Sequence, residues 1–224
     1  LEEVMAYRRM VRRTVANVIR SLPMSLPIDW DSAFWPILMG IDHERIHLET
    51  SSVLIRQHQL SQVKKHTLWS SVPYSGNAPR NELLPVPAGT VTLGIDNQAE
   101  YYAWDNEYGT HEAEVESFEA SKYLVSNREF FDFFKDNGYL TDKYWSEEGL
   151  QWREFSNVSH PTFWVWRGEW HLRLLAEEVP MRWDWPVEVN FHEAKAFCVW
   201  KSEKTGSPIR LPTEEEWYRL VDEA

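Results

Sequence analysis

The chain has 224 residues, of which 43% are hydrophobic and 14% aromatic, enough for one large or two small packed domains. Its 23 basic and 35 acidic residues give a formal net charge of −12, which argues against binding of a nucleic acid backbone as its main task. The one cysteine, Cys198, excludes an intramolecular disulfide framework and fits a reducing compartment, so the predicted location is cytoplasmic. No run approaches the roughly 20 apolar residues that a membrane helix needs, so no membrane partner is expected.

Two long helices are predicted in the first 58 residues. From Glu2 to Leu22 apolar residues recur at every third or fourth position, which is the spacing of one face of a helix. Pro23 ends this pattern, and a second helix is expected from about residue 33 to residue 57, with Pro36 tolerated in its first turn. Two long antiparallel helices indicate part of a helical bundle over residues 1–58.

The pattern of the sequence changes near residue 85. Residues 59–84 are polar and are interrupted by prolines and a glycine, so they are expected to form a linker. Beyond the linker, residues 86–94 alternate as a strand does, and residues 111–125 have the pattern of two short strands. Residues 85–224 are therefore predicted to form a mixed domain with little regular secondary structure, and the predicted fold class is α+β.

Three further helices are expected in this second domain. Ser126 or Asn127 can cap the first of them, over about residues 127–137. The second is expected over residues 191–205, with a glycine just after its end, and Thr213 can cap the last one in a capping box with a glutamate. The thirteen tryptophans and Cys198 are predicted to pack the core of this domain.

The stretch DHERIHLETSSVLIRQ, residues 42–57, contains the strongest candidate for chemistry. His43 and His47 lie four positions apart, so on a helix both imidazoles point the same way. Gly40 leaves space beside His43 and Leu54 adds apolar cover, as a partly enclosed metal site requires. Two histidines on one helix face can equally be hydrogen-bonded to the backbone of a neighbouring helix, and the spacing alone leaves both interpretations open.

The same five residues have the HExxH spelling of zinc proteases, but the third ligand of such a site is missing. That ligand is expected six residues after His47 with a glycine between, or as an acid on the next helix. The first position holds Val53, and no Asp or Glu occurs between Glu49 and Glu82. The sequence therefore argues against a zinc protease.

Glu49 lies about 200° around the helix from His47, so it cannot complete a triad with both histidines. It is expected either to pair with Arg45 one turn away or to orient a metal ligand through a hydrogen bond. None of the remaining histidines has a partner at ligand spacing: His58, His66, His111, His160, His171 and His192. A third ligand is therefore expected before Leu1.

The stretch MGIDHERIHLETSSVLIRQ resembles the iron-binding helix of the iron(II) sulfoxide synthases, in their ovothiol branch more than in their ergothioneine branch. The blocks that follow are similar to those of a formylglycine-generating-enzyme-like domain, in the same order: VPAGTVTLG, YAWDNEYGTHEAEVESFEASKYLVSNREFFDFF, WPVEVNFHEAKAFCVW and RLPTEEEW. Together the similarities cover nearly all of the chain. They imply a partial DinB-like helical bundle followed by a formylglycine-generating-enzyme-like (C-type-lectin-like) mixed domain that is truncated at its C-terminus.

The resemblance implies a mononuclear non-haem iron(II), Fe(2+), held by three histidines, two of them at the positions of His43 and His47. The third belongs to an earlier helix of the bundle, and the proton-donating tyrosine of the family is expected beyond Ala224. The implied reaction joins the thiol of L-cysteine to the imidazole of L-histidine with O2, which gives 5-histidylcysteine sulfoxide. Ile46 stands where the ergothioneine branch has a glutamine, which fits a different mode of substrate binding.

Both implied substrates carry carboxylates, and Arg8 and Arg12, one helical turn apart, are candidates to bind them. The alternative is that these arginines form a solvated face. Two other functions stay open, an ergothioneine-type synthase that acts on trimethylhistidine and a non-catalytic ligand-binding scaffold. Because a third ligand is expected outside the chain, we expect the chain alone to bind iron weakly and to form no product.

Overall fold

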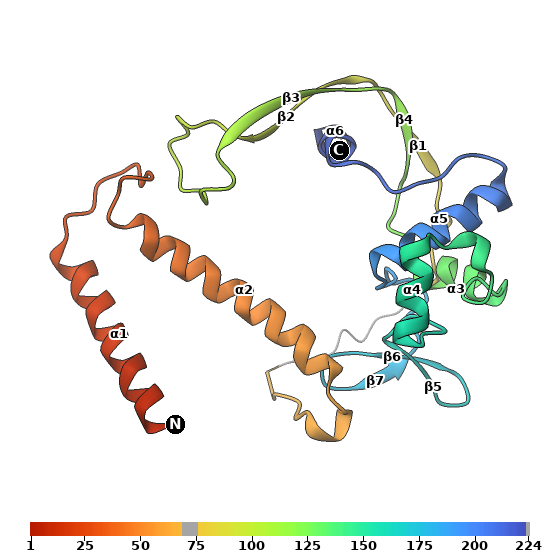
Figure 1. The fold of residues 1–224 in the computed structure, drawn as a ribbon, viewed down its shortest axis with the longest axis horizontal. Helices are drawn as coiled ribbons and strands as arrows, with labels where there is room; N and C mark the ends of the chain where they lie inside the picture. The colour runs from red at the N-terminus through yellow and green to blue at the C-terminus, as the bar shows by residue number, and fades with distance from the viewer. Residues whose placement is uncertain (69–75, 223–224) are drawn as a thin grey trace. The chain divides into compact units, whose positions relative to one another are not determined.

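The computed structural model describes residues 1–68 and 76–222, which form two compact units. Unit 1 consists of Leu1–Val53 and Thr92–Ala113, and unit 2 consists of Leu54–Val91 and Glu114–Ala224 (Figure 1). The predicted division near residues 58 and 85 differs from these units, because residues 92–113 group with the N-terminal helices. None of the helices in the described part of the chain combines the length and the hydropathy that a membrane crossing demands.

Unit 1 contains the two predicted helices, α1 (Glu2–Ser21) and most of α2 (Trp35–Gln57), and their ends lie within two residues of the predicted ones. The expected packing of the two helices is not found, since no residue of α1 is buried. The apolar stripe of α1 is present, but its side chains are 39% to 63% exposed; it consists of Val4, Tyr7, Val11, Val15 and Ile19. An amphipathic face becomes buried only where another layer covers it, and the sequence pattern does not specify that layer.

The first four strands form two short pairs. β1 (Leu83–Val86) pairs with β4 (Phe118–Ser121), and β2 (Gly89–Ile95) lies beside β3 (Gly109–Val115). The strands predicted within 86–94 and 111–125 are thus confirmed. β1 begins inside the predicted linker, of which residues 69–75 lie outside the described part of the chain.

Unit 2 holds the remaining helices and one three-stranded sheet of order β5-β6-β7. Its elements, with a short 3-10 turn η1 (Leu60–Gln62) before them, are α3 (Asn127–Lys135), η2 (Asp142–Tyr144), α4 (Glu147–Ser156), β5 (Trp164–Trp166), β6 (Trp170–Arg173), β7 (Glu178–Pro180), α5 (Phe191–Thr205) and α6 (Glu214–Asp222). This mixed architecture confirms the α+β class. The predicted end of α6 at residues 223–224 lies outside the described residues.

Local capping explains where these helices begin. Ser126 caps α3 by accepting the Glu129 N–H at 3.2 Å, as predicted. Asn190 and Glu193 form a capping box at the start of α5, and Thr213 accepts the Glu216 N–H at 3.2 Å before α6. Helix α4 was not predicted, although Ser146 caps it in the same way by accepting the Gly149 N–H.

The core of unit 2 is an aromatic cluster, as predicted for the tryptophans. Its fully or nearly fully buried rings pack edge to face or stacked, and they include Phe130, Phe133, Trp164, Phe197 and Trp200. Cys198 is buried beside them, which confirms its predicted place in the core. Such rings bury large areas, so a small number of them stabilises a domain with little regular secondary structure.

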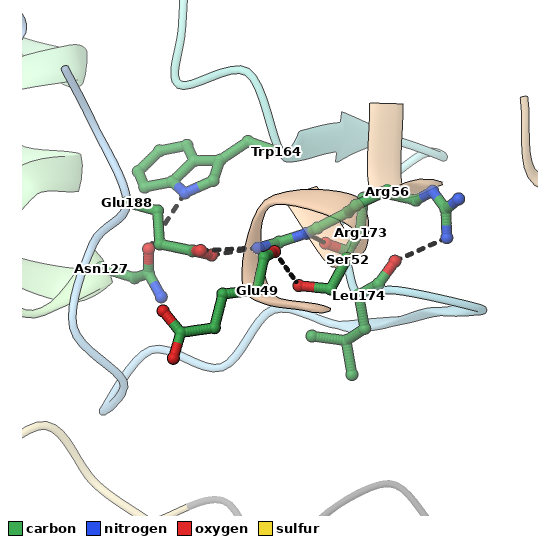
Figure 2. A network of polar contacts seen from close by, with 8 residues as sticks. All are labelled: Glu49, Ser52, Arg56, Asn127, Trp164, Arg173, Leu174 and Glu188. Atoms are coloured by element: carbon green, nitrogen blue, oxygen red, sulfur yellow. Dashed lines mark hydrogen bonds and ion pairs between the residues drawn. The ribbon is translucent and has the colours of Figure 1, made fainter. Parts of the chain in front are cut away.

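One buried amide joins three segments of unit 2. Asn127, only 1% exposed, donates its backbone N–H to the Trp185 carbonyl at 2.8 Å and its side-chain Nδ2–H to the Arg182 carbonyl at 2.8 Å. Its Oδ1 accepts the indole N–H of Trp164 at 3.0 Å, as Figure 2 shows. The first turn of α3 is thereby tied to β5 and to the segment that follows β7.

Replacing Asn127 by alanine is expected to destabilise unit 2 by about 3 kcal/mol, because the Trp164 indole and the Arg182 carbonyl lose their buried partner. The measurement is urea unfolding followed by tryptophan fluorescence. Gln151→Ala, which truncates an exposed amide on α4, is the matched control and should leave the midpoint nearly unchanged. Equal midpoints for the two variants would contradict the role assigned to Asn127.

A second buried polar group, the carboxyl group of Glu193, accepts the Tyr139 hydroxyl at 2.5 Å and the Asn190 N–H at 2.9 Å. Burial raises the pKa of Glu193, and the hydrogen bonds from Tyr139 and Asn190 oppose part of this rise. A carboxyl group whose pKa is higher in the folded than in the unfolded state contributes stability at low pH, and this contribution is lost as the pH rises through the folded pKa.

The stability advantage of the wild type over Glu193→Gln should therefore shrink as the pH rises above the ordinary glutamate pKa. Urea unfolding of both proteins between pH 4 and pH 8 measures this difference. Glu148→Gln, at an exposed position of α4, should show no such trend. An advantage that grows with pH would mean that the charged form of Glu193 is the favoured one.

Candidate metal centre

The two histidines of α2 lie together, as their spacing predicts. The ring centroids of His43 and His47 are 4.5 Å apart, and the rings meet edge to face at 89°. Both side chains are exposed, and the backbone hydrogen bonds of the helix fix their spacing one turn apart. The prediction that they share one face is therefore confirmed, whereas the alternative of two histidines on a core-facing stripe is not found.

The surroundings of the pair are more open than predicted. A Cβ atom placed on Gly40 meets no atom within 4 Å, so space is present one turn before His43. Leu54, however, is 60% exposed and provides no apolar cover. The predicted apolar cover by Leu54 is thus not found, because apolar cover depends on a neighbouring element that helix spacing cannot supply.

The beginning of α2 is covered instead by the loop between β2 and β3, which lies beside it in unit 1 (Figure 1). The Trp35 indole donates to the Ala103 carbonyl at 2.9 Å, and the Trp104 ring lies 6.5 Å from the His43 ring. Burial raises the pKa of the neighbouring Tyr102, and the negative charges of Asp42 and Glu107 raise it further. The sequence interpretation missed this contact, although the block YAWDNEYG marks the loop as aromatic and acidic.

Glu49 and Arg45 do not form the predicted ion pair. Arg45 pairs with Asp42 at 3.3 Å, on the opposite side along the helix. Glu49 is exposed, and its backbone carbonyl accepts the Ser52 hydroxyl at 2.6 Å (Figure 2). An i,i+3 partner of equal charge competes with an i,i+4 partner at similar energy, so the sequence could not decide between the two.

Arg8 and Arg12 lie one turn apart on the exposed surface of α1, next to its apolar stripe. In the described part of the chain, neither guanidinium contacts His43 or His47. Binding of a substrate carboxylate by these two arginines therefore stays a prediction.

His43 and His47 can provide two of the ligands of a metal ion. Neutral imidazoles suit iron(II) and related transition metals, and two of them at i and i+4 supply two adjacent coordination positions. Within residues 1–68 and 76–222 no group of three or more His, Cys, Asp or Glu side chains is arranged to hold a metal ion. His58 and His66, the nearest histidines along the chain, make backbone-linked contacts instead, through the His58 carbonyl and the His66 ring.

The last turn of α2 is anchored in unit 2. Arg56 forms a bidentate ion pair with Glu188 at 2.5 and 2.7 Å and donates its Nε–H to the Arg173 carbonyl at 2.7 Å (Figure 2). Its guanidinium also lies 3.7 Å from the ring centre of Phe163. A planar guanidinium that meets a carboxylate and an aromatic face together cannot be replaced by lysine, so this end of the helix depends on arginine.

Comparison with known proteins gives one family. Residues 71–219 match the family described as the sulfatase-modifying factor enzyme 1-like domain. The chain is 32% identical over 206 residues to hercynine oxygenase of Mycobacterium tuberculosis. This alignment covers 91% of the chain and 46% of that protein. It is 30% identical over 164 residues to formylglycine-generating enzyme of Bos taurus, covering 66% and 41% of the two chains.

A more distant similarity is to ergothioneine biosynthesis protein 1 of Neurospora crassa, 21% identical over 248 residues, which covers 96% of this chain and 27% of that protein. The chain spans about half or less of the length of these curated relatives. Similarity to hercynine oxygenase extends to α2, which precedes the matched domain, because it covers 91% of the chain.

Substitution of either histidine by alanine should weaken the binding of cobalt(II), an air-stable spectroscopic substitute for iron(II), by about tenfold or more, which corresponds to roughly 1.4 kcal/mol. The physical reason is that one imidazole alone loses the chelate geometry of the pair. Titration followed by the visible absorption of cobalt(II) measures it. Glu49→Gln, on the same helix, should keep the metal bound and weaken binding at most slightly, because Glu49 is expected to orient a ligand and not to bind the metal itself. Weakening equal to that of the histidine variants would show that the glutamate is a ligand.

Proposed function

Because this chain belongs to the family with a sulfatase-modifying factor enzyme 1-like domain, we propose that it forms part of an iron(II)- and O2-dependent enzyme that oxidises a histidine-derived substrate. The observation that carries the proposal is the adjacent pair His43 and His47, one helical turn apart on an exposed helix face. Supporting it, the relatives named above include a hercynine oxygenase and an ergothioneine biosynthesis protein.

The reaction that we propose is oxidative formation of a carbon–sulfur bond between the thiol of L-cysteine and the imidazole of L-histidine. Its product is 5-histidylcysteine sulfoxide, the intermediate of ovothiol biosynthesis. The S–H bond of the thiol and the C–H bond of the imidazole are broken, a C–S bond forms, and O2 accepts four electrons. One oxygen atom becomes the sulfoxide oxygen, and the other leaves as water with the two hydrogens. Ile46 favours this branch, since it places an apolar side chain beside His47 where the ergothioneine branch has an amide.

The residues of this chain have three proposed roles. His43 and His47 hold iron(II) through neutral imidazole nitrogens, and the bound metal supplies a common site where thiolate, imidazole and O2 meet. Arg8 and Arg12 are proposed to bind substrate carboxylates, since paired guanidinium groups on one helix face suit a carboxylate. Glu49 is proposed to orient a ligand of the site by a hydrogen bond, because its carboxylate is exposed and makes no ion pair with Arg45.

A second candidate function is ergothioneine-type synthesis, in which the imidazole substrate is trimethylhistidine. The names of the relatives from Mycobacterium tuberculosis and Neurospora crassa favour it. A non-catalytic ligand-binding scaffold is the third possibility, and the retained histidine pair argues against it, since a scaffold does not need two adjacent imidazoles.

The complete gene product that contains this chain should form 5-histidylcysteine sulfoxide when incubated in air with iron(II), L-cysteine and L-histidine, and mass spectrometry detects the product. A parallel reaction with trimethylhistidine in place of histidine distinguishes the two branches. His43→Ala and His47→Ala should each reduce product at least about 100-fold, as loss of a metal ligand does, while Glu148→Gln should leave the rate unchanged. Product from trimethylhistidine alone would favour the ergothioneine branch, and absence of product with both substrates would favour the scaffold.

A further inference from the structure

Trp104 lies beside the first histidine of the pair, although it is far away in the sequence. Its ring centroid is 6.5 Å from that of His43, and the two ring planes are inclined by 36°. His47 meets the same imidazole edge to face, with the ring centroids 4.5 Å apart. The His43 ring therefore has two aromatic neighbours, and the space by Gly40 is open.

The loop that carries Trp104 is itself held in place. The Glu107 carboxylate accepts the Trp104 N–H at 2.6 Å, and the Glu107 N–H donates to the Trp104 carbonyl at 3.1 Å, so the segment is closed into a turn. The Glu107 carbonyl accepts the Ile95 N–H at 2.9 Å, which ties the turn to β2. Both partners of the Trp35 to Ala103 hydrogen bond are buried, so the loop is also fixed to the beginning of α2.

These contacts distinguish Trp104 from the other aromatic residues of the loop. Tyr102 packs against Trp35 at 6.0 Å and has a buried hydroxyl, so it belongs to the packing beneath the loop. Tyr101 is 59% exposed and has no aromatic partner in the described part of the chain. Trp104 is half-buried, so part of its side chain stays accessible, and its ring is the one that lies near the His43 ring.

We propose that Trp104 is a positioning residue for the metal centre, which restricts the His43 imidazole to the orientation in which it can bind metal beside His47. An exposed imidazole on a helix rotates freely about its terminal torsion, and binding a metal must stop this rotation. An indole fixed next to the ring removes part of that freedom before the metal arrives, so affinity rises without any added ligand. The inference rests on the proposed function, because it assumes that the histidine pair binds a metal.

Cobalt(II) titration of the complete protein tests the proposal with two readouts, the dissociation constant and the quenching of tryptophan fluorescence. Trp104→Ala should weaken binding by about three- to tenfold, whereas Trp104→Phe, which keeps a ring at this place, should bind nearly as the wild type does. Quenching by bound cobalt should be smaller in Trp104→Phe than in the wild type, because the indole closest to the metal has been removed. Tyr101→Ala, in the same loop, is the matched control and should change neither readout.

The outcomes separate this inference from the proposed function. If the wild type binds cobalt and Trp104→Ala has the same dissociation constant, the positioning role is overturned and the proposed metal centre is not affected. Unchanged quenching in Trp104→Phe overturns the proximity on which the inference rests. Absence of cobalt binding by the wild type overturns the proposed function and this inference together. Circular dichroism of Trp104→Ala must match the wild type, and loss of helix signal there would overturn a purely positional role in favour of a structural one.

Discussion

The candidate site depends on the backbone hydrogen bonds of helix α2, which place residues four positions apart on the same face. The helix brings His43 and His47 into contact without help from any other element, because residues four apart stack one above the other. Its first turn is held through Trp35 in unit 1 and its last turn through Arg56 in unit 2. Between Trp35 and Arg56 most residues of the helix are exposed, and the two histidines are among them.

The two anchors are of different physical kinds. Trp35 is buried and uses one neutral hydrogen bond to a loop carbonyl, supported by packing against Trp30 and Tyr102. Arg56 combines an ion pair, a hydrogen bond to a backbone carbonyl and an aromatic contact, and its partner Glu188 is half exposed. An exposed ion pair alone contributes little, so the aromatic and backbone contacts carry much of the specificity at this end.

Unit 2 solves a separate problem, which is how to order a domain that has few long elements. Asn127 satisfies buried groups of three segments at once, and the aromatic rings around Phe133 and Trp164 fill the space between them. Such a domain tolerates long irregular connections because packed aromatic rings and the hydrogen bonds of Asn127 hold its core together, without a continuous sheet. Family membership over residues 71–219 is consistent with that architecture.

For the proposed function, the chain provides two adjacent exposed imidazoles and an ordered aromatic neighbour. The proposed sulfoxide synthesis would need a metal position at which a thiolate, an imidazole and O2 come close together, and an exposed i,i+4 pair would leave several coordination positions for them. Near this part of α2, burial and the negative charges of Asp42 and Glu107 raise the pKa of Tyr102.

The sequence by itself determined the features that depend on residues close together in the chain. It predicted the helices α1, α2, α3, α5 and α6, the caps Ser126 and Thr213, and the shared face of His43 and His47, because helix hydrogen bonds and caps join residues at most a few positions apart. Tertiary structure alone decided that Arg45 pairs with Asp42, that the α1 stripe stays exposed, and that Asn127 joins three segments. It also placed Ala103 against Trp35, 68 positions away, and Trp104 next to His43. Contacts of this range depend on how the whole chain closes on itself, and no local spacing encodes that closure.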